Sequence, residues 1–315
     1  MYAASRNPAG HKAVAMFLAL PFALLACSGG EKSDATVPVA EAHPVATPVA
    51  YTPPASTDSA SGSTFSSVPR FESAIDAYNA GEYRTAAEMY KVGVESKPGD
   101  AHGHYMLGLS TWKGGDFPEA LKALDKSLEL DPTFAKGYFN KARVLLDLNR
   151  APEALEVIEK GRAIDSASSD GRRLKARAQA ESGDVDGAME TYRELLVIND
   201  ADAWGLNNLG VLLLDRGEFE EAVGPLARVV QVRPTSPLFQ NNLGMALERS
   251  GHKVAALRHY EEGVRHDSTF VKVVRNAERL KAAGVDPTGT AEVSVADLAE
   301  EFRQKVKGWK GGTTK

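Results

Sequence analysis

Cysteine, aromatic residues and long apolar runs are all scarce in this sequence. One of its 315 residues is cysteine, which excludes a disulfide framework and a metal site built from several cysteines. Aromatic residues make up 7% of the chain while alanine is abundant, and this balance favours helices over a β-sandwich. The composition therefore predicts an all-α protein, and the length leaves one large domain, two domains or a repeat array open.

An excess of basic charge and the common catalytic motifs are also lacking. The chain has 37 lysine and arginine residues against 42 acidic ones, a net charge of -5. A general nucleic-acid binder needs a basic excess to neutralise phosphates, so that class is disfavoured. No HExxH, Walker loop, GxSxG or GxGxxG motif occurs. We predict a protein that is not an enzyme and has no cofactor; an enzyme with an unfamiliar site is the alternative.

Two groups of residues superficially suggest a metal site. Asp184, Asp186 and Gly187 look like part of a calcium loop, but the other ligand positions are missing and an aspartate there can cap a helix. Three histidines recur every seven residues, which on a helix leaves neighbours about 10.5 Å apart, too far to share an ion. They are His252, His259 and His266. The sequence therefore predicts no bound metal.

The sequence pattern of residues 1–26 predicts a signal peptide. Arg6 and Lys12 precede an uncharged run from 13 to 26, which is too short to span a bilayer. The run ends in Leu24-Leu25-Ala26-Cys27, which resembles the lipobox of bacterial lipoprotein precursors.

That resemblance implies cleavage before Cys27 and acylation of its thiol, for example by palmitate. Two or three acyl chains hold a domain on a membrane without a spanning helix. Ordinary secretory cleavage after Ser28 is the alternative. Ser28, rather than an aspartate, after the acylated residue favours the outer membrane, so we expect a lipid-anchored protein of the bacterial cell envelope that faces the periplasm.

Residues 27–66 follow as a tether rich in proline, alanine, serine and threonine. Five prolines between residues 38 and 54 are spaced too closely for a helix or a sheet strand. We expect disorder here, with a root-mean-square reach of about 35 Å. The folded part would therefore stand away from the membrane.

From residue 67 onward the sequence repeats itself six times, without insertion, through residue 270. We number these repeats 1 to 6; they start at Ser67, Ala101, Ala135, Ser169, Ala203 and Pro237. Position 8 is always alanine or glycine, position 20 is always alanine, and position 24 is always bulky, which predicts two helices in close contact. Position 15 carries residues that tolerate a positive φ and can end a helix, namely Gly81, Gly115, Asn149, Gly183, Gly217 and Gly251.

This pattern resembles the tetratricopeptide repeat, a helix-turn-helix unit of about 34 residues. The clearest copies run from Leu107-Gly108 through Ala120 to Pro132, and from Leu209-Gly210 through Ala222 to Pro234. The resemblance implies an all-α, right-handed α-solenoid with C-terminal capping helices. Gly224-Pro225 inside the second helix of repeat 5 departs from the pattern, and we expect a kink or a late helix start there.

The C-terminal part predicts two further helices. Residues 271–284 would form a capping helix and 285–293 a linker, followed by an amphipathic helix over 294–310 and a disordered tail over 311–315. The amphipathic helix has an apolar stripe of Val295, Leu298, Phe302, Val306 and Trp309. We expect this stripe to dock against repeat 6 and the capping helix; dimerisation and binding to a partner are the alternatives.

The family resemblance also implies a peptide-binding groove along the first helices of the repeats. Its ligand-facing positions hold an aromatic patch in repeat 2, a basic step in repeats 3 and 4, and a neutral part in repeats 5 and 6. An apolar peptide with nearby acidic groups or a free carboxylate would suit them. The candidates are His102, Tyr105, Leu109, Trp112, Lys136, Phe139, Asn140, Arg143, Leu146, Arg173, Arg177, Trp204, Asn207, Asn208, Asn241 and Asn242.

Two alternatives accompany this groove hypothesis. Tyr105 and Phe139 would fill the contacts between repeats, and the recurring asparagines would be structural residues of the repeat. The function expected from the whole sequence is a non-catalytic scaffold that binds a protein or peptide of the envelope, with the lipid as its only membrane contact. By resemblance, it is an assembly factor similar to type IV pilus pilotins or an adaptor of peptidoglycan-modifying enzymes.

Overall fold

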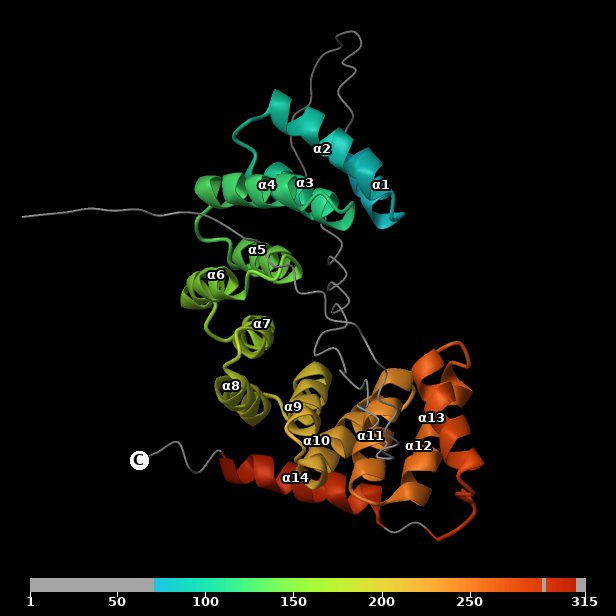
Figure 1. The fold of residues 1–315 in the computed structure, drawn as a ribbon. Coiled ribbons are helices and arrows are strands. Elements are labelled where there is room, and N and C mark those ends of the chain that lie inside the picture. The colour runs from blue at the N-terminus through green and yellow to red at the C-terminus, as the bar shows by residue number, and fades with distance from the viewer. Residues whose placement is uncertain (1–70, 291–292, 310–315) are drawn as a thin grey trace, which may run out of the picture. The chain divides into compact units, whose positions relative to one another are not determined.

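The computed structural model describes residues 71–290 and 293–309. The predicted signal peptide, Cys27, the tether and the tail from 311 lie outside these residues. Within them the chain forms fourteen helices and no strand (Figure 1), which confirms the all-α class. No helix in the described ranges has the length and apolar character needed to cross a membrane.

The helices come as six consecutive pairs, one pair in each repeat. The first helices are α1 (Phe71–Asn79), α3 (Ala101–Lys113), α5 (Ala135–Asp147), α7 (Ser169–Glu181), α9 (Ala203–Asp215) and α11 (Pro237–Arg249). The second helices are α2 (Tyr83–Ser96), α4 (Phe117–Leu130), α6 (Ala151–Ile164), α8 (Val185–Ile198), α10 (Phe219–Val232) and α12 (Lys253–His266). Each second helix packs against the first helix of its own repeat and that of the next, so the pairs form a stack.

The turn between the two helices of a repeat depends on position 15. All five glycines at this position have a positive φ, between +78° and +92°. Asn149 holds the same place in repeat 3 with φ of 57°, and no other non-glycine residue in the described ranges has a positive φ. The prediction made from this repeating position is confirmed, and it follows from the low cost of left-handed backbone for glycine and asparagine.

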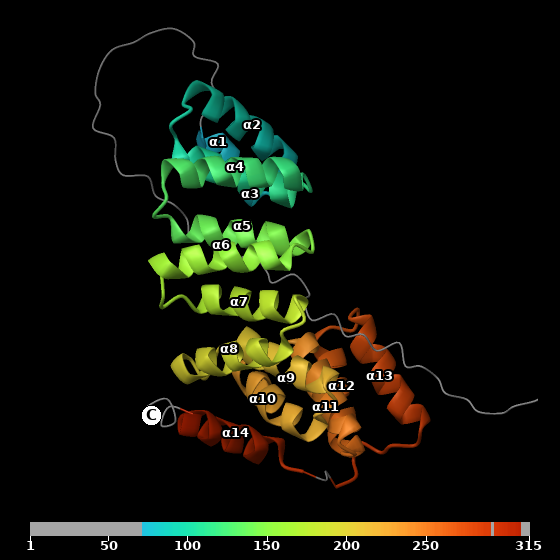
Figure 2. The ribbon, with the colours of Figure 1, turned by 60° about the vertical axis from the view of Figure 1, so that its left-hand side comes forward.

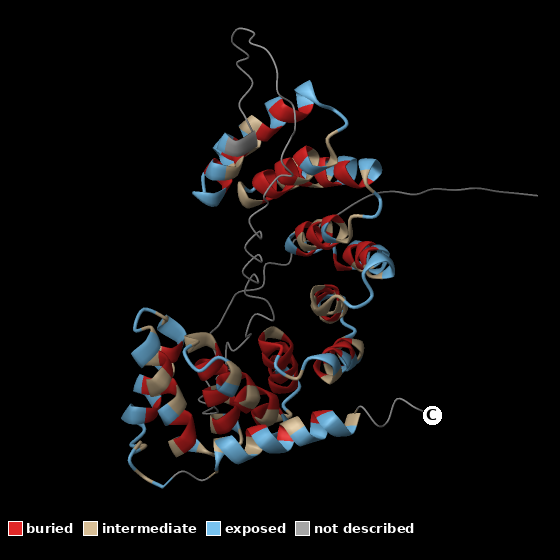
Figure 3. Cartoon of the chain, turned by 180° about the vertical axis from the view of Figure 1, so that it is seen from behind, coloured by how far each residue is buried: buried red, intermediate tan, exposed pale blue. Residues whose placement is uncertain are grey.

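Close contact within each pair depends on positions 8 and 24. A Cβ placed on Gly108 would lie 2.7 Å from Cγ of Leu124, so only glycine fits this contact. The same crowding occurs between Gly244 and the ring of Tyr260. Figure 3 shows buried residues where neighbouring helices face one another. The small and bulky positions read from the sequence therefore form the packing core of the repeats.

The helix α13 (Val271–Ala282) packs against α12 and α11. Its Asn276 donates a hydrogen bond to Oδ1 of Asn241 at 2.9 Å. Both terminal nitrogens of Arg279 donate to the carboxylate of Glu248, each at 2.6 Å. The pKa of Glu248 would be raised by burial, but these hydrogen bonds more than offset that effect and hold it below its usual value. Polar contacts therefore fasten α13 to repeat 6.

The last helix, α14 (Val295–Trp309), lies against α10 and α8 (Figures 1 and 2). The docking expected on repeat 6 and α13 is therefore wrong, although the apolar stripe does dock on its own chain. Phe302 and Val306 are buried, and a Cβ on Gly224 of α10 would lie 3.1 Å from Cβ of Phe302. Gly224 has no side chain, and this allows α14 to approach α10 closely.

Pro225 lies inside α10, which begins at Phe219. A late start of the helix after this proline is therefore not observed. Its missing amide donor is accommodated within a continuous helix. The glycine here takes part in the docking of α14, as the contact between Gly224 and Phe302 shows.

Candidate protein-binding surface

The predicted groove residues differ in how far they are exposed to solvent. His102 and Lys136 are exposed, while four are half-buried, namely Tyr105, Arg143, Arg173 and Trp204. The other ten are buried: Leu109, Trp112, Phe139, Asn140, Leu146, Arg177, Asn207, Asn208, Asn241 and Asn242. A ligand would therefore meet only part of the set expected from the sequence.

Phe139 fills the space between repeats 3 and 4. A Cβ placed on Gly161 or Gly171 would fall within 3 Å of its ring. Its side chain therefore fills the contact between these repeats, which is the alternative to a ligand contact. Leu109 and Leu146 are likewise in the core, so none of the three presents a side chain to a ligand.

His102, Tyr105 and Phe134 form a partly exposed aromatic group near the N-terminal ends of α3 and α5. The rings of Tyr105 and Phe134 meet edge to face with centroids 4.8 Å apart, and His102 lies 5.9 Å from Tyr105. The hydroxyl of Tyr105 accepts a hydrogen bond from Asn140 at 2.7 Å. Burial raises the pKa of Tyr105 to about 12, so the phenol stays neutral. This group offers a partly exposed, uncharged aromatic surface.

Trp112 is not part of that surface. Its indole nitrogen donates to Oδ2 of Asp147 at 2.8 Å, which ties α3 to α5. The side chain is buried, with Lys113 lying over its ring at 4.9 Å from the centroid. Trp112 therefore joins two repeats.

The three arginines expected to form a basic step lie against carboxylates of the chain itself. Arg143 pairs with Asp170, and Arg173 donates to Oδ2 of Asp202 at 2.7 Å. Arg177 donates to Glu181 at 2.7 Å and lies 3.5 Å from Asp147. Since four carboxylates face three guanidinium groups, the step carries no basic excess, and this expectation was wrong.

Asparagines of repeats 5 and 6 form a relay of hydrogen bonds. The amide of Asn276 donates to Asn241, Asn241 to Asn242, Asn242 to Asn207, and Asn207 to Asn208, over distances from 2.8 to 3.3 Å. Asn208 then donates to the hydroxyl of Tyr192 at 3.0 Å. Each amide in the relay is buried or half-buried and already paired. The asparagines therefore connect neighbouring helices, and each uses an amide hydrogen to do so.

Comparison with known proteins agrees with this geometry. Models of the tetratricopeptide repeat family match residues 71–133, 112–178 and 203–233. Residues 71–178 and 203–233 therefore form tetratricopeptide repeats. No curated protein matches the sequence.

Solved tetratricopeptide repeat proteins have a similar fold. The structure reported for a functional characterisation of pilF from Pseudomonas aeruginosa is 19% identical with a TM-score of 0.53, over 68% of this chain and 93% of that one. A tetratricopeptide repeat protein from Parabacteroides merdae is 12% identical with a TM-score of 0.55, over 67% and 82%. At these identities the likeness is one of fold.

Several residues that shape this surface of the tetratricopeptide repeats were missed in the sequence. Asp170 and Asp202 partner the arginines, and Tyr192 ends the asparagine relay. One signal was available: Asn140 and Tyr105 are 35 residues apart, as are Asn242 and Asn207. Position 6 of one repeat thus bonds to position 5 of the repeat before it.

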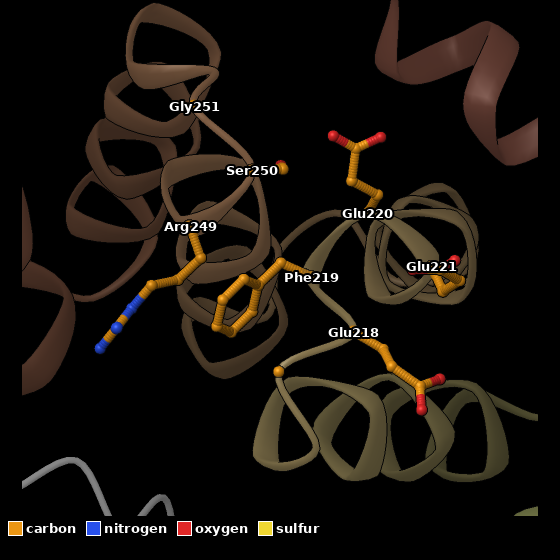
Figure 4. A pocket seen from close by; sticks show the side chains of 8 residues that line it. Glu218, Phe219, Glu220, Glu221, Arg249, Ser250 and Gly251 are labelled. Atoms are coloured by element: carbon orange, nitrogen blue, oxygen red, sulfur yellow. The ribbon is translucent and has the colours of Figure 1, made fainter.

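A shallow hollow of about 400 Å³ lies at the turns of repeats 5 and 6 (Figure 4). Arg249 lies over the ring of Phe219, 5.8 Å from its centroid. Figure 4 shows Glu218 and Glu220 pointing away from Arg249. These charged groups do not converge on one point, so we assign no ligand to the hollow. In the described ranges no three histidine, cysteine or acidic side chains gather as a metal site would require.

Proposed function

We propose that this chain is a non-catalytic scaffold of the bacterial cell envelope, which binds a protein or peptide along the first helices of its repeats. The observation that carries the proposal is a set of partly exposed aromatic and aliphatic side chains on these helices. Tyr105 lies on α3, and position 2 holds Trp204 on α9 and Leu238 on α11. Partly exposed aromatic and aliphatic anchors of this kind suit peptide recognition.

The ligand that fits has apolar anchors and little charge. Because Arg143, Arg173 and Arg177 are already paired, an acidic peptide gains little from them without displacing a carboxylate of the chain. Trp204 meets Phe239 edge to face at 5.5 Å, which holds its ring in place. An apolar segment that packs across α9 and α11 is therefore the favoured ligand.

Membrane attachment through Cys27 completes the proposal. Cys27 ends an uncharged run of the signal-peptide type, and Ser28 after it favours the outer membrane. A scaffold held there would serve as an assembly factor of pilotin type or as an adaptor for peptidoglycan-modifying enzymes. The same repeat surface suits either task, so the captured partner decides between them.

Site-specific photo-crosslinking tests the proposal. A photoreactive amino acid is placed at His102 or Leu238 in cells, and a matched control is placed at Lys122, an exposed residue of the second helix α4. We expect one envelope protein to crosslink at both first-helix positions and not at Lys122. Equal crosslinking at all three positions, or none at His102 and Leu238, would show that the partner uses another surface.

A further inference from the structure

The second helix of repeat 5 differs from those of the other repeats at two positions. Position 22 is Gly224 and position 25 is Ala227 in α10. Elsewhere both positions are charged, as Glu88, Lys122, Glu156, Glu190 and Arg258, and as Lys91, Asp125, Glu159, Arg193 and Glu261. Phe302 of α14 lies directly over Gly224. The loss of long charged side chains thus creates a surface on α10 that accepts a helix.

The helix α14 fills this surface only in part. Ala299, Phe302 and Val306 are buried, but Trp309 is half-buried. A cleft of about 790 Å³ remains between α14 and α8. Its apolar lining comes from Val197, Ile198, Leu209, Leu213, Phe302 and Trp309. We call the surface around Gly224 and Ala227, together with this cleft, the helix seat.

Two residues that line the cleft border open space. Ile198, at the end of α8, is 57% exposed although it lines an apolar cleft. Gly308 of α14 also lines the cleft, and a Cβ built on it meets nothing within 4 Å. A helix with a bulky apolar residue in place of Gly308 would bury more apolar surface than α14 does.

The attachment of α14 depends mainly on the seat. Its main contacts are with α10 and α8, while α12 and α13 precede it in the chain. The linker is fixed by Arg258, whose guanidinium donates to the carbonyl oxygens of Pro287 and Gly289. A second helix with the same apolar pattern would therefore compete for the same surface.

We propose that the helix seat is a docking site for an amphipathic helix of a partner protein, which α14 occupies in the unbound chain. The partner helix has the spacing of α14, an aromatic residue facing Gly224, and a bulky apolar residue in place of Gly308. The site lies mainly on the second helices α8 and α10, with Leu209 and Leu213 of α9 also lining the cleft, and it does not include the exposed first-helix residues proposed above.

Charge contributes little to this docking. The lining of the cleft also includes three basic and four acidic side chains, namely Arg172, Arg193, Lys305, Glu190, Glu194, Glu218 and Glu221. Arg193 already pairs with Glu190 at 3.3 Å. Burial of apolar surface drives the association, so it depends weakly on salt.

The test uses labelled synthetic peptides that span residues 293–309. One carries Gly308→Leu and the other Gly308→Ala, so that the alanine peptide accounts for the gain in helix propensity. They are titrated into the full chain carrying Phe302→Ala, because the chain's own helix otherwise competes at an effective concentration of the order of mM. We expect the leucine peptide to bind about tenfold more tightly than the alanine peptide.

A matched pair of variants locates the effect. Ile198→Glu, added to the same chain, should remove the advantage of the leucine peptide. Ile164→Glu should leave it, since Ile164 holds the same repeat position on α6, is 43% exposed and lines no part of the cleft. Equal affinity of both peptides, an advantage that survives Ile198→Glu, or no binding of either peptide would overturn the proposal. Circular dichroism checks each fold, and Val306→Ala replaces Phe302→Ala if that chain unfolds.

Discussion

The side-chain amide of Asn242 donates a hydrogen bond to Oδ1 of Asn207, 35 residues earlier, at 2.8 Å. Both residues are buried, and the bond joins α11 to α9. In water these amides would find partners readily, whereas in the stack each depends on the next. The asparagines thus hold repeats 5 and 6 and α13 in a fixed register.

Replacing Asn242 with alanine should destabilise the protein by about 1–3 kcal/mol, because it leaves Asn207 and Asn241 with unpaired buried groups. Asn276→Ala should cost less, since only Asn241 loses a donor. Urea unfolding followed by circular dichroism measures both. Midpoints equal to that of the parent chain would mean that the relay adds nothing to stability.

Gly108 and Gly99 should respond to alanine with opposite signs. A Cβ at Gly108 would collide with Leu124, and such overpacking costs about 1–3 kcal/mol. Gly99 has no atom within 4 Å of a Cβ and no positive φ, so alanine there should stabilise by about 0.4–1 kcal/mol. Thermal unfolding of the two variants measures both changes in stability. A stabilised Gly108→Ala chain would contradict the tight contact between Gly108 and Leu124.

Acid should weaken the fold through His259. Its Nδ1 lies 2.8 Å from Oε1 of Gln240, and burial lowers its pKa from 6.5 to about 4, against the opposing effect of Glu262. Since the unfolded chain binds this proton more tightly, stability falls as the pH drops from 6.5 towards 4. The loss is on the order of 2 kcal/mol at pH 4.5.

His259→Gln should flatten this part of the pH profile of the unfolding free energy. His252→Gln, at the turn before α12, serves as the control and should keep the profile of the parent chain. A profile that is equally steep in the His259→Gln chain would assign the acid sensitivity to other groups.

Cys27 should carry the lipid. Cys27→Ala should leave an uncleaved precursor and abolish labelling by a palmitate analogue, because Leu24-Leu25-Ala26-Cys27 resembles a lipobox, in which the thiol is acylated. Metabolic labelling and detergent partitioning measure this. Cys27→Ser is the closest control in size and should behave in the same way. Labelling that persists in either variant would place the acyl group elsewhere or favour secretory cleavage.

Local features of the repeats were predictable from the sequence. Position 15 requires a positive φ, and positions 8 and 24 meet within one helix pair. Both features therefore follow from the residues of a single repeat. Contacts between repeats were harder to predict. Arg143 of repeat 3 and Asp170 of repeat 4 meet because successive pairs stack at a particular angle, and no pattern within one repeat sets that angle.

The docking of α14 was missed although the sequence contained its signal. Gly224 and Ala227 are the only uncharged residues at their two repeat positions. The pair Gly224-Pro225 predicts a bend, but what matters for α14 is the side chain that Gly224 lacks. Positions 22 and 25 are charged in every other second helix, so their uncharged residues indicate that α10 is the second helix covered by another part of the chain.

Replacing Gly224 with arginine should therefore release α14 while the repeats stay folded. Arg258 holds the same position in repeat 6, so the stack tolerates the side chain, but at position 224 it would collide with Phe302. A loss of about 2 kcal/mol raises the undocked population of the helix roughly thirtyfold. Chymotrypsin should then cleave at Phe302 faster than in the Glu156→Arg chain, which places the same side chain at position 22 of repeat 3. Equal cleavage rates in the two chains would mean that another contact holds α14.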